Sequence, residues 1–257
     1  MKTLLRLEFS KLFHLSSVRV SLVLLAVFPI AWAYAPGVYD VYRFYLVSGY
    51  QLPGLTLLSS MEFLLPLLVA IASAELLGLE RTYGTLPTVL LRPVTRSRWL
   101  LTKLLVALTY PFLLLSFLLL VSLASGVFFG YGAFVGGTGV GEAGLLGQGT
   151  TLPGAAIGEL LRAYTVAAFS LVPISLLAVL FTVVFVNAAG GALATLAVLI
   201  FMKLLVVFPG LGRFLLTEHL DAYAAPSGTL PWAMMLLAVY AAGFAALAVT
   251  LFERKDF

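Results

Sequence analysis

The chain has 257 residues, of which 62% are hydrophobic and only 10% are charged, and its mean hydropathy is +1.10. Soluble domains carry about a quarter charged residues, so this composition excludes an ordinary soluble domain and predicts an integral membrane protein. The absence of cysteine excludes disulfides and thiolate metal sites, and two histidines are too few for a histidine metal cluster. The net charge of +4 takes its meaning from where the charges fall.

The first predicted element is an amphipathic helix at the N-terminus. Its sequence, MKTLLRLEFSKLF, sets Leu4, Leu5, Leu12 and Phe13 among charged residues. A helix with one apolar and one charged face lies along a membrane surface. We therefore expect an interfacial helix ahead of the first membrane span.

Six apolar windows follow, each long enough for a membrane-spanning helix of roughly 20 residues. Their unbroken apolar character favours helices over the strands of a membrane barrel, which alternate. The windows are about residues 18–35, 55–78, 99–126, 161–186, 189–208 and 230–252. The sequence thus predicts an all-α integral membrane protein, with residues 1–257 forming a single transmembrane domain and leaving no room for a separate catalytic domain. Pro66, Pro111 and Pro173 fall inside windows and are expected to mark kinks.

The positive charges predict the orientation of the spans. They lie before the first span, around the connection between the second and third, and after the sixth, which share one side in a six-span layout. Because positive loops stay in the cytoplasm, we expect both termini and the 80–98 loop to be cytoplasmic, in a plasma (inner) membrane. The residues are Lys2, Arg6, Lys11, Arg19, Arg81, Arg92, Arg96, Arg98, Lys103, Arg254 and Lys255.

Two segments are expected on the opposite, exterior side. Residues 126–158 are rich in glycine and predict a flexible loop, since no Lys-Ser/Thr pair follows the glycines as nucleotide binding would require. Residues 209–229 set Phe214 and Leu220 beside charged residues. This pattern predicts a short interfacial helix that dips into the outer headgroups.

The 80–98 loop holds the densest charge of the chain and is the best pointer to function. Gly84 and Pro87 interrupt the helix that leaves the membrane. A short helix then begins with Thr85 as its N-cap, and Pro93 ends it. Two interpretations are open: a positively charged anchor on anionic lipid, or a rigid docking element for a cytoplasmic protein.

The motif Glu80-x-x-x-Gly84-Thr85-Leu86-Pro87, followed by Leu91-Arg92-Pro93-Val94-x-Arg96, resembles the coupling segment of the ABC-2 type permeases. These permeases are the membrane subunits of ABC exporters. The start Leu7-Glu8-x-x-Lys11-Leu12 and the ending Phe252-Glu253-Arg254-Lys255-Asp256 are also similar to that family's termini. The six-span layout agrees, so the resemblance covers essentially the whole chain.

The resemblance implies a permease that works with a second permease copy, as a homodimer or a heterodimer, in contact with membrane lipid and not with nucleic acid. A separate ABC ATP-binding subunit would hold ATP and Mg²⁺ and hydrolyse the ATP, because this chain lacks a Gly-x-x-x-x-Gly-Lys-Ser/Thr motif. We therefore expect no enzymatic activity and no cofactor in this chain. The residues assigned to coupling are Glu80, Arg81, Gly84, Thr85, Leu86, Pro87, Arg92, Pro93 and Arg96.

The resemblance also suggests roles for four of these residues. Glu80 would pair with a basic residue near the loop or with the partner. Gly84 would allow a close backbone approach or an unusual turn. Arg92 and Arg96 would hold the short helix against the membrane face or against acidic groups of the ATP-binding subunit.

Charge inside a span is costly and indicates function by default, and three ionisable residues stand out there: Glu62, Glu75 and Lys203. Glu62 and Lys203 lie at comparable depth toward the exterior side, so one hypothesis is an ion pair on the translocation path. The alternative is that Lys203 extends to the outer surface. Glu75 lies near the cytoplasmic end, where we expect it to pair with Arg81 or Arg98.

Two other functional classes are open. A secondary transporter would show inverted repeats or more buried acids than Glu62. An intramembrane protease would need paired glutamates and a histidine within the membrane, whereas His14 and His219 fall outside the spans. An exporter permease is the leading hypothesis, and its apolar path suits a lipid, a hydrophobic drug or peptide, or a small ion.

Overall fold

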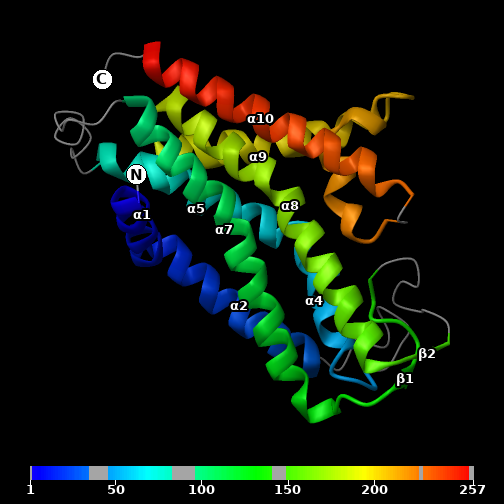
Figure 1. The fold of residues 1–257 in the computed structure, drawn as a ribbon. Coiled ribbons are helices and arrows are strands. Elements are labelled where there is room, and N and C mark those ends of the chain that lie inside the picture. The colour runs from blue at the N-terminus through cyan, green and yellow to red at the C-terminus, as the bar shows by residue number, and fades with distance from the viewer. Residues whose placement is uncertain (1, 35–45, 83–95, 141–148, 226–227, 255–257) are drawn as a thin grey trace.

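The computed structural model describes residues 2–34, 46–82, 96–140, 149–225 and 228–254, and in them the fold is a bundle of helices with one short antiparallel ladder (Figure 1). The helices are α1 (Lys2–His14), α2 (Ser16–Tyr34), α4 (Gln51–Met61), α5 (Leu64–Thr82), α7 (Arg96–Ser125), α8 (Pro153–Phe185), α9 (Ala188–Leu205) and α10 (Leu230–Arg254). The 3₁₀ turns are η1 (Gly126–Phe129), η2 (Gly212–Phe214) and η3 (Leu216–Tyr223). The ladder joins β1 (Phe134–Val135) to β2 (Thr150–Thr151).

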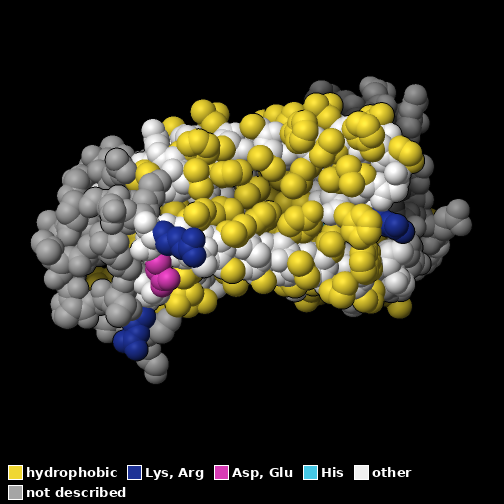
Figure 2. Space-filling model, turned by 90° about the horizontal axis from the view of Figure 1, so that it is seen from above, with side chains coloured by type: hydrophobic (Ala, Val, Ile, Leu, Met, Phe, Trp, Pro, Cys, Tyr) yellow, Lys and Arg dark blue, Asp and Glu magenta, His cyan; other side chains and the backbone are white. Residues whose placement is uncertain are grey.

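The helices suit a membrane. Five described helices are long and apolar enough to cross one, and the bent pair of α4 and α5 makes a sixth if it is one span. Figure 2 shows hydrophobic side chains over the middle of one face and charged side chains toward its ends. Leu193, Phe201 and Val239 are each more than half exposed, which water would penalise and lipid would not. The chain is therefore an all-α membrane protein, as predicted.

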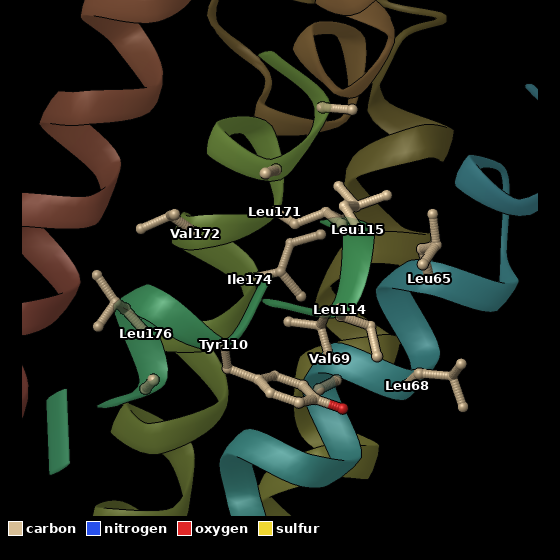
Figure 3. Close-up of a cluster of buried hydrophobic side chains, with 14 of the residues drawn as sticks. Leu65, Leu68, Val69, Tyr110, Leu114, Leu115, Leu171, Val172, Ile174 and Leu176 are labelled. Carbon is tan, nitrogen blue, oxygen red and sulfur yellow. The ribbon is translucent and has the colours of Figure 1, made fainter. Parts of the chain in front are cut away.

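The central helix of the bundle is α8. Its apolar window is 78% buried, against 22% for those of α2 and α9. It packs against α5, α7, α9 and α10. Figure 3 shows this core, where Leu171 and Ile174 of α8 lie among Val69 of α5 and Leu114 of α7. Because lipid tails are as apolar as leucine, such contacts stabilise the bundle through close packing.

Buried serines fix the relative heights of three helices. Ser175 of α8 donates to the carbonyl oxygen of Ala107 in α7 at 2.5 Å. Its oxygen also lies 2.9 Å from that of Ser73 in α5. Hydrogen bonds between membrane helices contribute about 0.6–2 kcal/mol each, so the two contacts specify register more than they add stability.

The second predicted span is bent by 64° where α4 meets α5. Pro66 supplies the cause, because a proline ring clashes with the carbonyl group four residues earlier, here that of Glu62. Within the first turn of α5 the missing N–H of Pro66 leaves no helical bond unmade. The kink predicted at Pro66 is confirmed, whereas Pro111 and Pro173 lie inside the unbroken helices α7 and α8.

The described part of the glycine-rich segment packs against α4. A Cβ atom on Gly54 would lie 1.8 Å from the carbonyl oxygen of Thr138, so the two backbones touch. The side chain of Gln51 donates to the carbonyl oxygen of Gly137 at 3.4 Å. The prediction of a flexible loop missed this packing, because the glycine that permits it lies in α4 and not in the loop.

The segment after α9 also packs on protein. It forms the 3₁₀ turns η2 and η3 rather than an α-helix. Leu216, Leu220 and Tyr223 of η3 are buried, and η3 packs against α8, α9 and α10. Leu220 of the predicted interfacial face is therefore buried against protein, whereas Phe214 of η2 is exposed, and the contact of this segment with headgroups stays a prediction.

Candidate functional site

One end of the bundle gathers the chain segments on both sides of residues 83–95. There α5 ends, α7 begins, and α1 packs against α7 (Figure 1). The end of α10 joins them, since Trp99 and Phe252 stack with ring centroids 5.3 Å apart and Ser97 donates to Glu253. The amphipathic N-terminal helix and the base of the predicted coupling loop are therefore neighbours.

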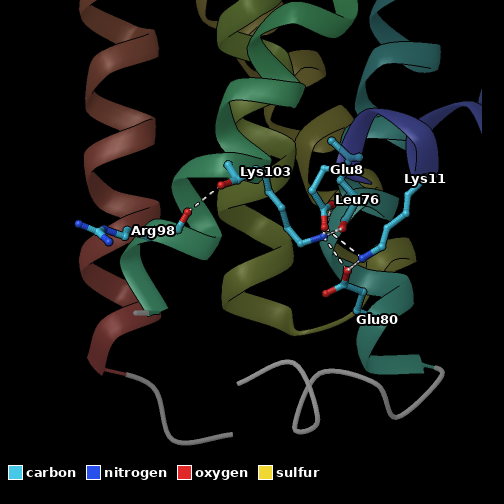
Figure 4. Close-up of polar contacts among 7 residues, drawn as sticks. Glu8, Lys11, Leu76, Glu80, Arg98 and Lys103 are labelled. Carbon is cyan, nitrogen blue, oxygen red and sulfur yellow. Dashed lines mark hydrogen bonds and ion pairs between the residues drawn. The ribbon is translucent and has the colours of Figure 1, made fainter. Parts of the chain in front are cut away.

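Four charged side chains at this end form an ionic cluster, defined as Glu8, Lys11, Glu80 and Lys103 (Figure 4). The Nζ atom of Lys103 lies 2.9 Å from Oε2 of Glu8 and 3.0 Å from Oε1 of Glu80. It also donates to the carbonyl oxygen of Leu76 at 2.5 Å. The Nζ atom of Lys11 lies 3.0 Å from Glu8 and 2.8 Å from Glu80. With two carboxylates and two ammonium groups, the cluster has no net charge.

The cluster is built around a buried lysine. The side chain of Lys103 is 1% exposed, and a charge at such a depth is tolerated only when it is paired and hydrogen-bonded. Its three N–H donors meet three acceptors, and the ring of Trp99 lies 4.9 Å from Nζ as a cation–π partner. The cluster therefore ties α1 to α5 and α7.

The surroundings keep the α1 side chains ionised. Burial opposes the charge of Glu8, but Lys103 and Lys11 outweigh it and hold the pKa of Glu8 below its ordinary value of 4.5. Burial also opposes the charge of Lys11, but Glu80 and Glu8 hold the pKa of Lys11 above 10.5. A lowered carboxyl pKa stabilises the fold above pH 4.5, and a raised lysine pKa does so below pH 10.5. The contribution of the cluster is lost as the pH falls through the lowered value or rises through the raised one.

We expect Glu8→Gln to destabilise the fold at pH 7 and to have little effect in acid. At neutral pH the variant lacks a charge that the wild type uses, whereas well below pH 4.5 the wild-type carboxyl group is itself neutral. The measurement is thermal unfolding of both proteins in detergent across this range. Glu159→Gln in α8, which is outside the cluster, is the control, and a Glu8→Gln difference that stays constant into acid contradicts the assignment.

Glu80 is the predicted coupling residue whose side chain the structure describes. It pairs with Lys11 and Lys103, which is one of the two arrangements expected for it. Arg81 and Arg96 belong to α5 and α7, but their side chains lie outside the described part. The other assigned residues, Gly84, Thr85, Leu86, Pro87, Arg92 and Pro93, lie outside the described residues, and their roles stay predictions.

Sequence reasoning missed the partnership of α1 with this end. Glu8 shares a helix face with Leu5 and Leu12, and Lys103 shares one with Trp99 and Ala107. A charge on a mostly apolar helix face predicts a partner of opposite sign on a neighbouring element. That signal was present, although nothing in it says which partner each charge takes.

Glu75 accepts a hydrogen bond from the hydroxyl of Ser17 in α2 at 2.5 Å. The side chain of Arg81 lies outside the described part, so the pairing of Glu75 with Arg81 or Arg98 stays a prediction. The contact ties α2 to α5 near the end that holds the ionic cluster.

Glu62 and Lys203 line one pocket at the break between α4 and α5. Its volume is about 460 Å³, and Thr217, Asp221 and Tyr223 of η3 complete it. The predicted equal depth agrees with the helix packing. Gly78 of α5 touches Ala188 at the start of α9, and counted from that contact at ~1.5 Å per residue, Glu62 and Lys203 each lie about 23 Å toward the other end of the bundle. Among the described residues, however, no ion pair within 4.0 Å joins Glu62 to Lys203.

Asp221 adds a third charge to the pocket. Burial raises the pKa of Asp221 above its ordinary value of 3.8, against the opposing charge of Lys203, and the carboxylates of Glu218 and Glu62 add to the rise. The pocket is therefore lined by one positively charged side chain, Lys203, and by the carboxyl groups of Glu62 and Asp221, which interact electrostatically. Across the described ranges, no group of three or more His, Cys, Asp or Glu side chains could hold a metal ion.

Residues 22–257 match the model of a family described as "Protein of unknown function (DUF2705)". None of the curated proteins matches the chain. The matched range includes Glu80, Lys103 and the pocket, while α1 precedes it. With nearly its whole length covered, the chain belongs to the DUF2705 family.

Proposed function

We propose that the chain is the permease subunit of an ABC exporter, which moves its substrate while a separate ATP-binding subunit supplies the energy. The observation that supports this best is the ionic cluster, because it joins the helices that flank the 80–98 loop. The resemblance of the loop to the ABC-2 coupling segment indicates which partner would dock there, namely an ABC ATP-binding subunit. The excess of positive charge at this end favours a cytoplasmic location, in a plasma (inner) membrane.

A docked subunit can drive the membrane helices only if the ends of the loop move as one body. Lys103 and Glu80 tie the start of α7 to the end of α5, and Glu8 adds α1 to the same body. Both α5 and α7 pack against the central helix α8. A force on the loop would therefore reach the whole bundle, and two permeases, identical or related, would open alternately to either side.

The test is to isolate the tagged chain from its native membranes in mild detergent and identify what accompanies it. We expect a stoichiometric partner with a Walker A motif, whose ATP hydrolysis depends on the complex. The double variant Gly84→Trp with Arg92→Glu should reduce recovery of that partner at least tenfold. Gly243→Trp in α10, where a Cβ atom meets nothing within 4 Å, is the matched control.

Recovery of the chain alone under several detergents would remove the coupling assignment. Equal recovery of the partner with the double variant would place docking elsewhere on the chain. In the first case a secondary transporter becomes the next hypothesis, to be tested by transport that depends on an ion gradient.

A further inference from the structure

The pocket at the break between α4 and α5 joins a charged chamber to an apolar groove. Glu62, Lys203 and Asp221 line this chamber, which is open to the surface, because all three residues are exposed. A smaller cavity of about 70 Å³ shares Glu62 and Lys203 with the chamber and continues past Leu199 and Ile200 of α9. A binding site with this form suits a molecule with a polar head and an apolar chain.

A buried hydroxyl group lines both cavities. Thr217 is 5% exposed, and its Oγ1 atom has no hydrogen-bond partner within the described part of the chain. Leaving a buried hydroxyl unpaired costs free energy, so a native structure keeps one where something else supplies the partner. The position of Thr217 between chamber and groove indicates that the partner is the polar head of the bound molecule.

The groove opens on the side of the bundle that faces lipid. Ile200 is 60% exposed and Leu204, one turn further along α9, is 64% exposed. Large apolar side chains exposed on a membrane-spanning helix are favourable in hydrocarbon and unfavourable in water. The occupant of the groove therefore enters from the bilayer.

We propose that this pocket binds a zwitterionic phospholipid whose headgroup carries a primary ammonium group, with phosphatidylethanolamine as the type. Lys203 pairs with the phosphate, while Glu62 and Asp221 accept from the ammonium group. The Thr217 hydroxyl bonds to the headgroup, and one acyl chain follows the groove along α9. Two carboxylates against one lysine disfavour an anionic lipid, which carries no cation to offset them.

Binding is measured on the purified chain by native mass spectrometry, with equal amounts of dioleoyl phosphatidylethanolamine and dioleoyl phosphatidylglycerol. We expect about a tenfold preference for phosphatidylethanolamine. Glu62→Gln should remove most of this preference, because only phosphatidylethanolamine carries the ammonium group. Lys203→Gln and Thr217→Val should weaken binding of phosphatidylethanolamine itself about tenfold, whereas Glu159→Gln leaves its binding and the preference unchanged. Equal binding of the two lipids overturns the proposal, and so does a preference that survives Glu62→Gln.

Two further arms test the groove and the source of the ligand. Ile200→Trp fills the groove and should weaken binding about tenfold, while Leu193→Trp, exposed on the same helix outside it, should not. Dodecylammonium carries the ammonium group without the phosphate, so Lys203→Gln should strengthen its binding while weakening that of the phospholipid. If the chain binds dodecylammonium but does not bind the phospholipid, the lipid assignment is overturned in favour of a cationic amphiphile.

That the bound phospholipid is also the transported substrate rests on the proposed exporter function. The binding assay contains no ATP-binding subunit, so its outcome does not depend on coupling. If no ATP-binding partner is recovered but the lipid preference is measured, the exporter proposal is contradicted and the lipid site stands. If the partner is recovered but no lipid preference is measured, the lipid site is contradicted and the exporter proposal stands.

Discussion

Lys103→Met should destabilise the protein by about 3–5 kcal/mol, the usual cost of removing one partner of a buried ion pair. Methionine fills nearly the volume of lysine, so the loss is electrostatic and not a cavity. It leaves Glu8 and Glu80 facing each other with Lys11 as their remaining ammonium partner in the cluster, and that lysine is half exposed. Thermal unfolding in detergent, followed by the loss of monodisperse protein, measures the effect.

Two comparisons separate the ionic cluster from a general loss of positive charge. Arg254→Met removes an exposed cation at the same end of the bundle and should change stability by less than about 1 kcal/mol. Adding Glu8→Gln to Lys103→Met should recover part of the loss, because one uncompensated carboxylate is removed with the lysine. A Lys103→Met protein as stable as the wild type would mean that the cluster does not hold α1 in place.

Gly78→Leu should destabilise the fold by about 3 kcal/mol or more, because it drives α5 and α9 apart. A Cβ atom on Gly78 would lie 2.5 Å from both the Cβ and the backbone nitrogen of Ala188. Ala188 opens α9, whose start is fixed by the Asn187 side chain accepting from the N–H of Ala189 at 2.9 Å. The backbone of α9 cannot move aside without losing that cap.

The matched control is Gly243→Leu in α10, where the new side chain meets open space. Leucine forms helix better than glycine, so this variant should be stabilised by up to about 1 kcal/mol. The two variants are compared by their unfolding temperatures in the same detergent. Equal effects of the two substitutions would show that the contact of α5 with α9 is looser than the structure has it.

The helices were predictable because hydropathy and proline act locally. An apolar run of about 20 residues identifies a span without knowledge of its neighbours. The bend at Glu62 follows from Pro66 four residues later, again within one segment. The α8 helix nevertheless begins at Pro153, before the predicted start at residue 161, because polar Glu159 and Arg162 lower the hydropathy of its first turns without ending the helix.

The site was less predictable because its contacts join distant segments. Glu8 and Lys103 are 95 positions apart, and either charge alone fits a surface anchor as well as a buried pair. The apolar face of η3 suits headgroups or protein equally, so Thr217 and Asp221 could not be placed beside Lys203 from the sequence. Equal depth of Glu62 and Lys203 was predictable from helix length, whereas the cavity that separates them was not.

The central place of α8 has a consequence for the order in which the protein is made. Residues 153–185 leave the ribosome after α2, α4, α5 and α7, although the core is built around them. Until they insert, acyl chains can cover leucines such as Leu114, but lipid offers no hydrogen bond to Ser73. The nascent chain therefore passes through an incomplete bundle in which Ser73 lacks its α8 partner until residues 153–185 insert.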